Sequence, residues 1–127
     1  MGHPTIYPTG VTVYNPEKCW NGFTIFQALE VGAVLMNMNG RENKVWKGVH
    51  GFPNKIFPGG YLMTSRGSRD GRYGVQDGLD LVQIDWDGNV VWKFDRNEYI
   101  EDPGIPGRWM ARSHHDYQRE GSTTGYY

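Results

Sequence analysis

A stretch of sequence used twice is the feature that most constrains the fold of this chain. Residues 33–46 (AVLMNMNGRENKVW) and 80–94 (DLVQIDWDGNVVWKF) each contain an apolar strand, a turn dipeptide ending in glycine, and a second strand with Val and Trp. The turn glycines Gly40 and Gly88 are 88 − 40 = 48 residues apart, and Trp46 and Trp92 are 92 − 46 = 46 apart. A period of about 45 residues made of short strands is typical of β-propeller blades.

The turn dipeptides predict the hairpin geometry. Asn39-Gly40 and Asp87-Gly88 are strong short-range hairpin signals. A type I′ turn requires positive φ at both central residues, and these pairs tolerate it best. The sequence therefore predicts two hairpins with type I′ turns.

The similarity continues further along the chain after a jump. HGFPNKIFPGGYL (50–62) matches HDYQREGSTTGYY (115–127) without a gap, at an offset of 115 − 50 = 65. The larger offset indicates an insertion in the second copy, at 95–110, which is rich in Pro and Gly and is predicted to be a loop. We expect a single domain over 1–127, with N-terminal strands in 1–32, a first repeat in 33–79 and a second in 80–127.

Composition supports an all-β fold. The 18 glycines, 7 prolines and 14% aromatic residues suit short strands and tight turns. The chain holds about two to three blades' worth of antiparallel strands, whereas closed propellers have about 4–8 blades. We therefore expect part of a β-propeller, completed by further blades of the same polypeptide, by self-association or by another chain. A β-sandwich is the alternative.

The charge balance and the N-terminal sequence limit the partners and the cellular location that we expect. With 13 basic and 14 acidic residues, the chain lacks the basic field that nucleic acid or an anionic membrane requires, so neither is an expected partner. MGHPTIYPTG contains no signal peptide, which predicts a cytoplasmic location as given, or a periplasmic one if a leader has been removed. Cys19 is the single cysteine and is expected to be a small buried hydrophobe. The arginine-containing segment 66–74 is expected to be a solvated surface loop.

Titratable side chains concentrate in ARSHHDYQRE (Ala111–Glu120), which has the pattern of a strand. Alternation would place His115 and Arg119 on one face, and Arg112 and His114 on the other. The repeat favours His115, because it is equivalent to His50. Innermost propeller strands line a central channel, where two such histidines would converge. A recurrent histidine that only hydrogen-bonds a neighbouring blade is the competing interpretation.

Other features of the sequence bear on binding. Adjacent histidines on one strand chelate poorly, and neither an H-x-x-x-H motif nor a cysteine pair occurs, so we expect no metal site and no cofactor. Trp109 lies in the inserted segment between Arg108 and Arg112. It would either face a substrate or anchor the loop. The other tryptophans are expected to pack between sheets.

Several segments together resemble the bacterial arylsulfotransferase (arylsulfate sulfotransferase) family. They are YPTGVTVYNPEKCWNGFTIF, GFPNKIFPGGYLM, DLVQIDWDGNVVWKF and RWMARSHHDYQREG, and they span nearly the whole chain. The resemblance implies a β-propeller with a funnel-like central site. It also implies transfer of a sulfuryl group from an aryl sulfate to a phenol through a sulfohistidine, without a nucleotide donor.

The resemblance also suggests roles for particular residues. The H-H-D element places His114 and His115 at the channel as catalytic candidates, with His115 preferred. His50, Arg112, Arg119 and Trp109 are candidates for substrate binding. The family's nucleophilic histidine is expected in a later blade, so this chain would supply channel-lining, anion-binding residues and be inactive in isolation. The alternative is a non-catalytic propeller module for binding or assembly.

Overall fold

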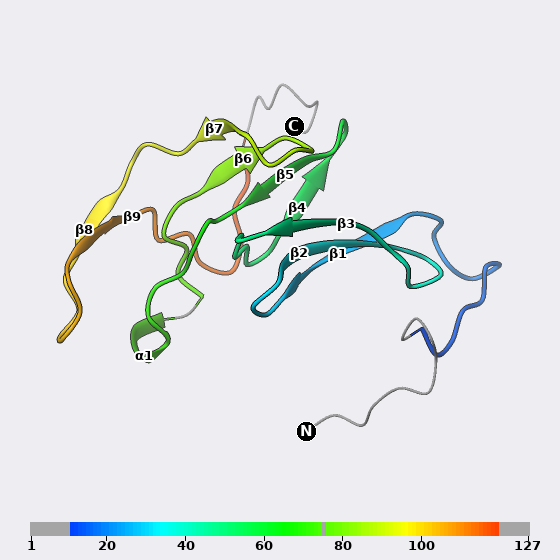
Figure 1. Ribbon diagram of the computed structural model, residues 1–127, viewed down its shortest axis with the longest axis horizontal. Helices are drawn as coiled ribbons and strands as arrows, with labels where there is room; N and C mark the ends of the chain where they lie inside the picture. The colour runs from blue at the N-terminus through cyan, green and yellow to red at the C-terminus, as the bar shows by residue number, and fades with distance from the viewer. Residues whose placement is uncertain (1–10, 75, 120–127) are drawn as a thin grey trace.

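The computed structural model describes residues 11–74 and 76–119, and these form antiparallel β-sheets in chain order (Figure 1). The first sheet contains β1 (Phe23–Ala28), β2 (Gly32–Asn37) and β3 (Glu42–Lys47). The second contains β4 (Lys55–Phe57), β5 (Tyr61–Thr64), β6 (Val82–Ile84) and β7 (Val90–Lys93). The third pairs β8 (Glu98–Ile100) with β9 (Arg108–Met110), and α1 (Gly71–Gly74) is a single short turn of helix.

The all-β class is confirmed, and this arrangement is consistent with part of a propeller or with a sandwich. The repeat boundaries predicted from the sequence fall inside the two large sheets rather than between them. Residue 33 lies within β2, and the boundary between 79 and 80 falls between β5 and β6 of the second sheet.

The β2–β3 and β6–β7 turns share one geometry, which differs from the predicted type I′ turn. Gly40 and Gly88 have φ of 74° and 92°, but Asn39 and Asp87 do not have positive φ. In each turn an Asx oxygen accepts two backbone N–H groups: Asn37 Oδ1 from Asn39 and Arg41, both at 3.0 Å, and Asp85 Oδ1 from Asp87 and Asn89, at 3.0 and 2.8 Å. These bonds favour a type I turn followed by a left-handed glycine, so only the glycine needs positive φ.

Strand pairing gives the two hairpins one constant offset. Val34 pairs with Val45, and Val82 pairs with Lys93, so 82 − 34 and 93 − 45 both equal 48. Both hairpins also have an irregularity in register at matching positions, Leu35/Met36 and Gln83/Ile84. Trp46 is therefore structurally equivalent to Phe94, at 94 − 46 = 48, and the offset of 46 to Trp92 is wrong.

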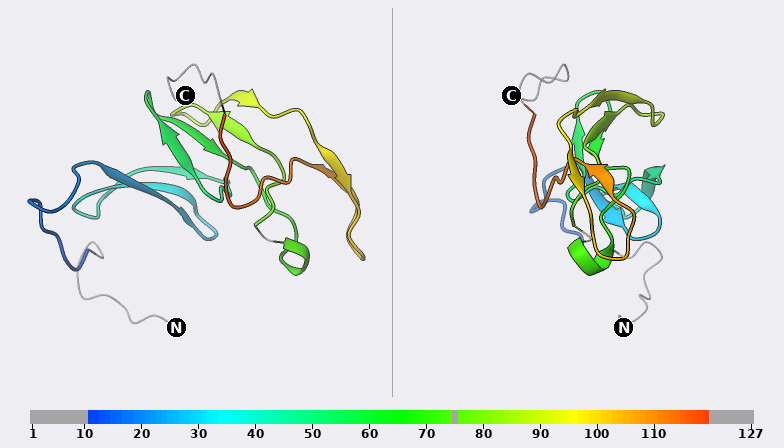
Figure 2. Two further views of the ribbon diagram at one scale, coloured as in Figure 1. Left: turned by 180° about the vertical axis from the view of Figure 1, so that it is seen from behind. Right: turned by 90° about the vertical axis from the view of Figure 1, so that its left-hand side faces the viewer.

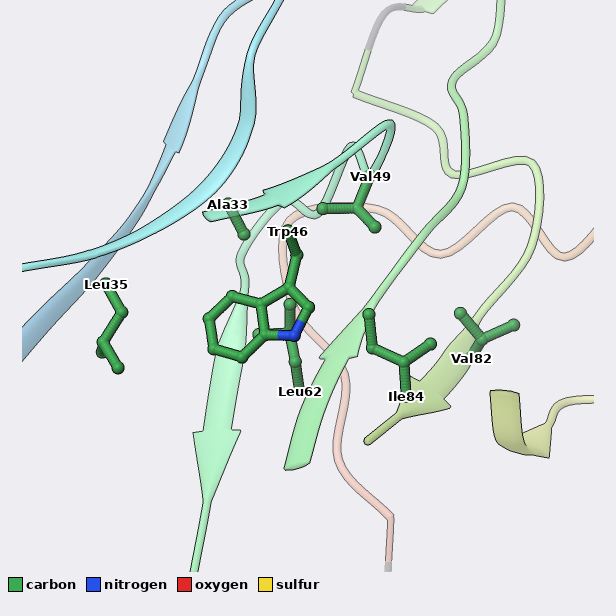
Figure 3. Packing of buried hydrophobic residues seen from close by; sticks show 7 residues of the cluster. All are labelled: Ala33, Leu35, Trp46, Val49, Leu62, Val82 and Ile84. Atoms are coloured by element: carbon green, nitrogen blue, oxygen red, sulfur yellow. The ribbon is translucent and has the colours of Figure 1, made fainter. Parts of the chain in front are cut away.

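The hydrophobic core lies between the first and second sheets (Figure 3). Its buried members come from β2, β3, the segment after β3, β5 and β6: Ala33, Leu35, Trp46, Val49, Leu62, Val82 and Ile84. The Trp46 indole donates from Nε1 to the Asp85 carbonyl at 3.2 Å and meets the edge of Trp86 with ring centroids 5.3 Å apart. Trp46 is thus the bulky side chain that joins the two sheets.

Some of the predicted packing is wrong. Trp20 is 96% exposed rather than packed between sheets. Cys19, expected to be buried, is also exposed. The segment 95–110, predicted to be a loop, contains the β8–β9 hairpin, which projects from the second sheet in Figure 1. No helix among the described residues is long and apolar enough to cross a bilayer.

Residues 111–119 cross the face of the second sheet that is turned away from the first sheet (left panel of Figure 2). We call this the outer face. It includes four residues that pair directly across the strands: Lys55, Met63, Gln83 and Trp92. The Tyr117 hydroxyl donates to the Met63 carbonyl at 2.7 Å and also contacts the Pro53 carbonyl. Arg119 donates from Nη1 to Gln83 Oε1 at 2.8 Å, and its guanidinium lies 4.4 Å from the Trp92 ring centroid.

The predicted strand over Ala111–Glu120 is wrong for the described part, 111–119. Arg112 and His115 have φ of 52° and 64°, and within 111–119 the only β-pairing is an isolated bridge between His114 and Asp116. Left-handed residues interrupt the period-two alternation of a strand. Strand alternation therefore gives no reason to prefer His115 over His114. Glu120 and the match of 120–127 to 55–62 lie outside the described residues.

Candidate functional site

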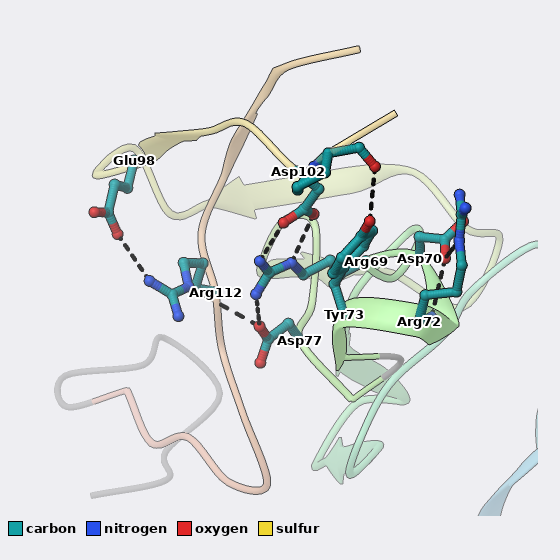
Figure 4. Close-up of polar contacts among 9 residues, drawn as sticks. Arg69, Asp70, Arg72, Tyr73, Asp77, Glu98, Asp102 and Arg112 are labelled. Carbon is teal, nitrogen blue, oxygen red and sulfur yellow. Dashed lines mark hydrogen bonds and ion pairs between the residues drawn. The ribbon is translucent and has the colours of Figure 1, made fainter. Parts of the chain in front are cut away.

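A polar cavity of about 540 Å³ lies where the β5–β6 connection, β8 and the C-terminal segment meet. Figure 4 shows Arg69 between Asp77 and Asp102, and Arg112 between Asp77 and Glu98. The lining residues are Arg69, Tyr73, Gly74, Asp77, Glu98, Arg112 and His114.

Backbone hydrogen bonds hold the C-terminal segment against the β5–β6 connection. The connection closes on itself through the Arg69 N–H, which donates to the Asp77 carbonyl at 2.8 Å. The Gly78 N–H then donates to the Ser113 carbonyl at 2.8 Å, and the Arg112 N–H donates to the Gly78 carbonyl at 3.1 Å. This pairing places the residue after Ser113, which is His114, beside Asp77.

Arg69 joins two carboxylates. It donates from Nη1 to Asp77 Oδ2 at 3.1 Å and from Nε to Asp102 Oδ2 at 2.8 Å, and its Nη2 also contacts Asp102. The hydrogen bonds that Arg69 donates, first to Asp102 and then to Asp77, raise the pKa of Arg69 above its ordinary value, and the bond from Arg69 lowers the pKa of Asp102. Bidentate guanidinium–carboxylate contacts are the strong class of ion pair. Arg69 is therefore occupied by the protein's own anions.

The prediction that 66–74 is simply a solvated loop is wrong for Arg69, whose side chain is 17% exposed. It fits Arg72, which is exposed and pairs with Asp70 inside the same loop. The Tyr73 hydroxyl donates to the Pro103 carbonyl at 2.7 Å. The loop is thus fastened to the connection between β8 and β9 by Arg69 and Tyr73.

Asp77 and His114 form a hydrogen-bonded pair at the cavity. Burial alone would raise the pKa of Asp77, but hydrogen bonds from His114 and then Arg69 outweigh it and hold this pKa below its usual value. An ionised carboxylate only accepts hydrogen bonds, so the His114 Nδ1 in contact with Oδ1 carries the proton. The neutral imidazole then has its lone pair on Nε2. The side chain of His114 is 47% exposed, so this ring is open to solvent on one side.

Arg112 is the more available cation. Its Nη1 lies 3.2 Å from Glu98 Oε2, and its Nε lies 4.0 Å from Asp77 Oδ2. Arg112 and Glu98 are both exposed, and solvent screening makes such pairs weak, worth about 0–1 kcal/mol. An incoming anion can therefore compete with Glu98 for Arg112.

The remaining predicted site residues lie elsewhere. The His115 ring contacts His114, with centroids 4.3 Å apart, and Phe52, with centroids 5.3 Å apart, but it does not line the cavity. His50 borders a separate cavity of about 220 Å³ beside the first sheet. Arg119 lies on the outer face, and the exposed Trp109 stacks edge-on against Tyr99 on the β8–β9 hairpin.

The structure thus brings together His114 and Arg112, but not His50, Arg119 or Trp109. The contact of His115 with Phe52, two residues after His50, does bring the two matching segments side by side. Across residues 11–74 and 76–119, no cluster of three or more His, Cys, Asp or Glu side chains could hold a metal ion.

The sequence analysis did not predict the acidic residues at this cavity, Asp77 and Asp102. His114 meets Asp77 across 37 residues, and Arg69 meets Asp102 across 33. Nothing in the local sequence marks such partners, because the pairing depends on how the β5–β6 connection folds. A charged loop with Arg and Asp at fixed spacing was visible, but its partners were not.

Comparisons with family models, curated proteins and solved structures found no match to this chain.

Proposed function

We propose that this chain is part of a sulfotransferase that moves a sulfuryl group from an aryl sulfate to a phenolic acceptor. The observation that supports it best is the Asp77–His114 pair beside Arg112 at an open polar cavity. The resemblance of the H-H-D segment to arylsulfotransferases supplies the reaction class. In this proposal His114, rather than His115, is the histidine that contacts the sulfuryl group.

The reaction needs a nitrogen nucleophile and stabilisation of developing charge. An imidazole nitrogen attacks sulfur, the sulfur–oxygen bond to the aryl group breaks, and the phenolate leaves with the bonding electrons. The acceptor phenol then gives up its proton to a base, its oxygen attacks the sulfur, and the nitrogen–sulfur bond breaks. Positioning and electrostatics dominate such transfers, as they do for phosphoryl groups.

His114 and Arg112 suit the electrostatic part of this task. Asp77 orients the His114 ring through Nδ1, and when the ring is protonated its Nε2 can donate to a sulfuryl oxygen. Arg112 supplies a second, permanent cation. The nucleophilic histidine itself is expected in a later part of the polypeptide, so this chain contributes binding and charge stabilisation.

The charge count sets the conditions for binding. The cavity lining has two arginines against Asp77 and Glu98, with His114 as the group that changes charge. Asp102, which pairs with Arg69, adds a third carboxylate, so these groups sum to one negative charge with a neutral His114 and to zero with a protonated one. The form of the site with a protonated His114 is therefore expected to bind an aryl sulfate anion more tightly than the form with a neutral ring.

Binding is tested with p-nitrophenyl sulfate and the whole chain, by following histidine ring signals in NMR. The expected result is a ligand-induced shift at His114, and an affinity for the ligand that falls about tenfold or more in Arg112→Gln. Arg72→Gln is the matched control, because Arg72 is also an exposed, ion-paired arginine. Ligand shifts confined to His50, or equal affinity in both variants, would contradict the proposed site.

Turnover is tested in the longer polypeptide or assembly that contains this chain. Release of p-nitrophenol from p-nitrophenyl sulfate on addition of phenol measures transfer. We expect His114→Gln to lower kcat/KM by about 10²-fold or more, as loss of a charge-stabilising donor does. An unchanged rate in this variant would remove His114 from the reaction.

A non-catalytic assembly module is the second candidate, and exposed apolar side chains favour it. Phe23 and Leu29, on and just after β1, are 62% and 78% exposed. Exposed apolar patches commonly mark interaction surfaces. Calorimetry with aryl sulfate separates the two candidates, since a pure scaffold would bind none in the cavity.

A further inference from the structure

A cavity of about 520 Å³ lies at one end of the first sheet, away from the polar cavity described above. It forms where the segment that leads into β1 meets the β2–β3 turn, and both lie at the same end of the sheet in Figure 1. Its volume is within the range of about 300–1,000 Å³ that is usual for small-molecule sites. Two aromatic rings and three carboxamides line it: Tyr14, Phe23, Asn21, Asn37 and Asn39.

Exposed aromatic rings form the apolar part of this lining. Tyr14 is 44% exposed, and Phe23, the first residue of β1, is 62% exposed. Phe23 pairs with Asn37 across β1 and β2, and directly opposed residues share one face of a sheet. The register therefore places an aromatic ring beside a carboxamide at the cavity, which gives a ligand one apolar surface and one hydrogen-bonding group.

The carboxamides offer hydrogen-bonding groups that the protein does not use. Asn37 Oδ1 accepts the N–H groups of Asn39 and Arg41, both at 3.0 Å, and this fixes the orientation of the amide. Its Nδ2 makes no hydrogen bond with any described residue. The side chains of Asn21 and Asn39 likewise make none within 11–74 and 76–119. Each free amide can both donate and accept, so the cavity can bind a ligand with several hydroxyl groups.

The second sheet contains an equivalent of each part of this cavity. The β2–β3 and β6–β7 turns correspond at the offset of 48, and the same side-chain hydrogen bonds hold both. Ile25 pairs with Leu35, and Met63 pairs with Gln83, the equivalent of Leu35. β1 therefore corresponds to β5 at an offset of 63 − 25 = 38, and the residues just before these two strands can be compared.

Trp86 closes the equivalent place in the second sheet. A Cβ atom added at Gly60 would lie 2.7 Å from the Trp86 ring, so the indole covers this glycine. The corresponding residues of the first sheet are Gly22 and Met38, at offsets of 38 and 48, and both line the cavity. A Cβ atom added at Gly22 would meet nothing within 4 Å. The cavity is therefore open because a methionine stands where the other repeat has a tryptophan.

The two turns also differ in what occupies the Asx side chain. In the second turn Asn89 Nδ2 donates to Asp85 Oδ2 at 3.0 Å, so both carboxylate oxygens are used. In the first turn Asn37 stands in place of Asp85, and Arg41 in place of Asn89. Asn37 therefore keeps the turn and retains a free donor group, whereas Asp85 keeps the turn and has no donor to offer.

We propose that this cavity binds a neutral carbohydrate. No charged side chain lines it among the described residues, so an ionic ligand would lose its water without gaining a partner. A neutral sugar satisfies the unused amides through its hydroxyl groups, and the apolar faces of its rings lie against Tyr14 and Phe23. This inference does not depend on the sulfuryl-transfer chemistry.

Binding is tested on the whole chain with cellotriose, maltotriose and xylotriose, by following asparagine side-chain amide signals in nitrogen-15 NMR. We expect at least one of these sugars to shift the signals of Asn37 and Asn39 with a Kd of about 1 mM or lower. Phenol, which has an aromatic ring but a single hydroxyl group, should shift them much less. No shift with any of the three sugars, or equal shifts with phenol, would overturn the proposal.

Two substitutions taken from the other repeat test the site itself. Met38→Trp introduces the side chain that Trp86 provides over Gly60, so it should fill the cavity and lower the affinity for the sugar at least about tenfold. Asn37→Asp keeps an oxygen that can accept both turn N–H groups, as Asp85 does, but removes the Nδ2 donors. It should also lower the affinity about tenfold.

The matched control is Asn43→Asp, which makes the same change of charge at an exposed residue of β3 outside the cavity. It should bind sugar like the wild type. Far-UV circular dichroism and urea unfolding identify the variants that keep the fold, and Asn37→Asp decides the matter if Met38→Trp does not. A folded Met38→Trp or Asn37→Asp chain that binds sugar as well as the control would contradict the proposal.

Discussion

Tyr117→Phe removes one oxygen from the contact that docks the C-terminal segment on the outer face. The Tyr117 hydroxyl reaches the carbonyls of Pro53 and Met63, and the Lys55 ammonium donates to the Tyr117 carbonyl at 2.6 Å. Burial, and then the charge of Asp116, raise the pKa of Tyr117, so its hydroxyl remains a donor throughout the working range of pH. The same segment carries His114, so this substitution links stability to the site.

The expected loss of stability follows from the atoms removed. The phenylalanine ring fills the same space, so no cavity forms, and the loss comes from carbonyl groups left without their donor. Leaving a buried acceptor unsatisfied costs about 1–3 kcal/mol. For a domain of this size that corresponds to a fall in Tm of roughly 4–15 °C.

Urea unfolding at pH 7 measures the effect, with an unchanged m-value required for the comparison. Tyr99→Phe is the matched control, because the exposed Tyr99 hydroxyl has no hydrogen-bond partner among the described residues, and its effect should stay within about 0.5 kcal/mol. A Tyr117→Phe chain as stable as the wild type would refute the docking of 111–119 on the second sheet.

Two further predictions concern the core and the carboxylates. Trp46→Ala should cost about 3–5 kcal/mol in urea unfolding, because Trp46 is only 3% exposed and joins the two sheets, whereas Trp20→Ala should change stability by less than about 0.5 kcal/mol. Acid should destabilise the fold, since native contacts hold the pKa values of Asp77, Asp102 and Asp116 below their ordinary values. Their stabilisation is present above the ordinary carboxyl pKa of about 4 and is lost as pH falls below it. Urea unfolding at pH 7, 4 and 3 measures how steeply the free energy of unfolding falls with pH, and Asp77→Asn should make this dependence weaker. An unchanged pH dependence in that variant would contradict the role given to Asp77.

Much of the sheet structure was predictable because it is local. Alternating apolar residues around Asn39-Gly40 and Asp87-Gly88 indicated both hairpins, and both formed. The turn type was not predictable from the dipeptide alone, because the side chains of Asn37 and Asp85 decide it. Aligning Trp46 with Trp92 by residue type gave the wrong register, since the strand irregularity shifts which residues face each other.

Only the basic residues of the candidate site were predictable from the sequence. The H-H-D segment marked His114, and the neighbouring Arg112 followed from proximity in sequence. Left-handed backbone at Arg112 and His115 broke the strand on which the choice of His115 rested. Asp77, the partner that orients His114, belongs to a connection whose fold depends on contacts more than 30 residues away, such as Arg69 with Asp102.

The proposed site requires that Asp77 hold His114 by Nδ1, and nitrogen-15 NMR of the histidine rings tests this directly. At pH 8 we predict that neutral His114 carries its proton on Nδ1, and that Asp77→Asn weakens this preference. A proton on Nε2 of His114 in the wild-type chain would contradict the pairing and the role proposed for it.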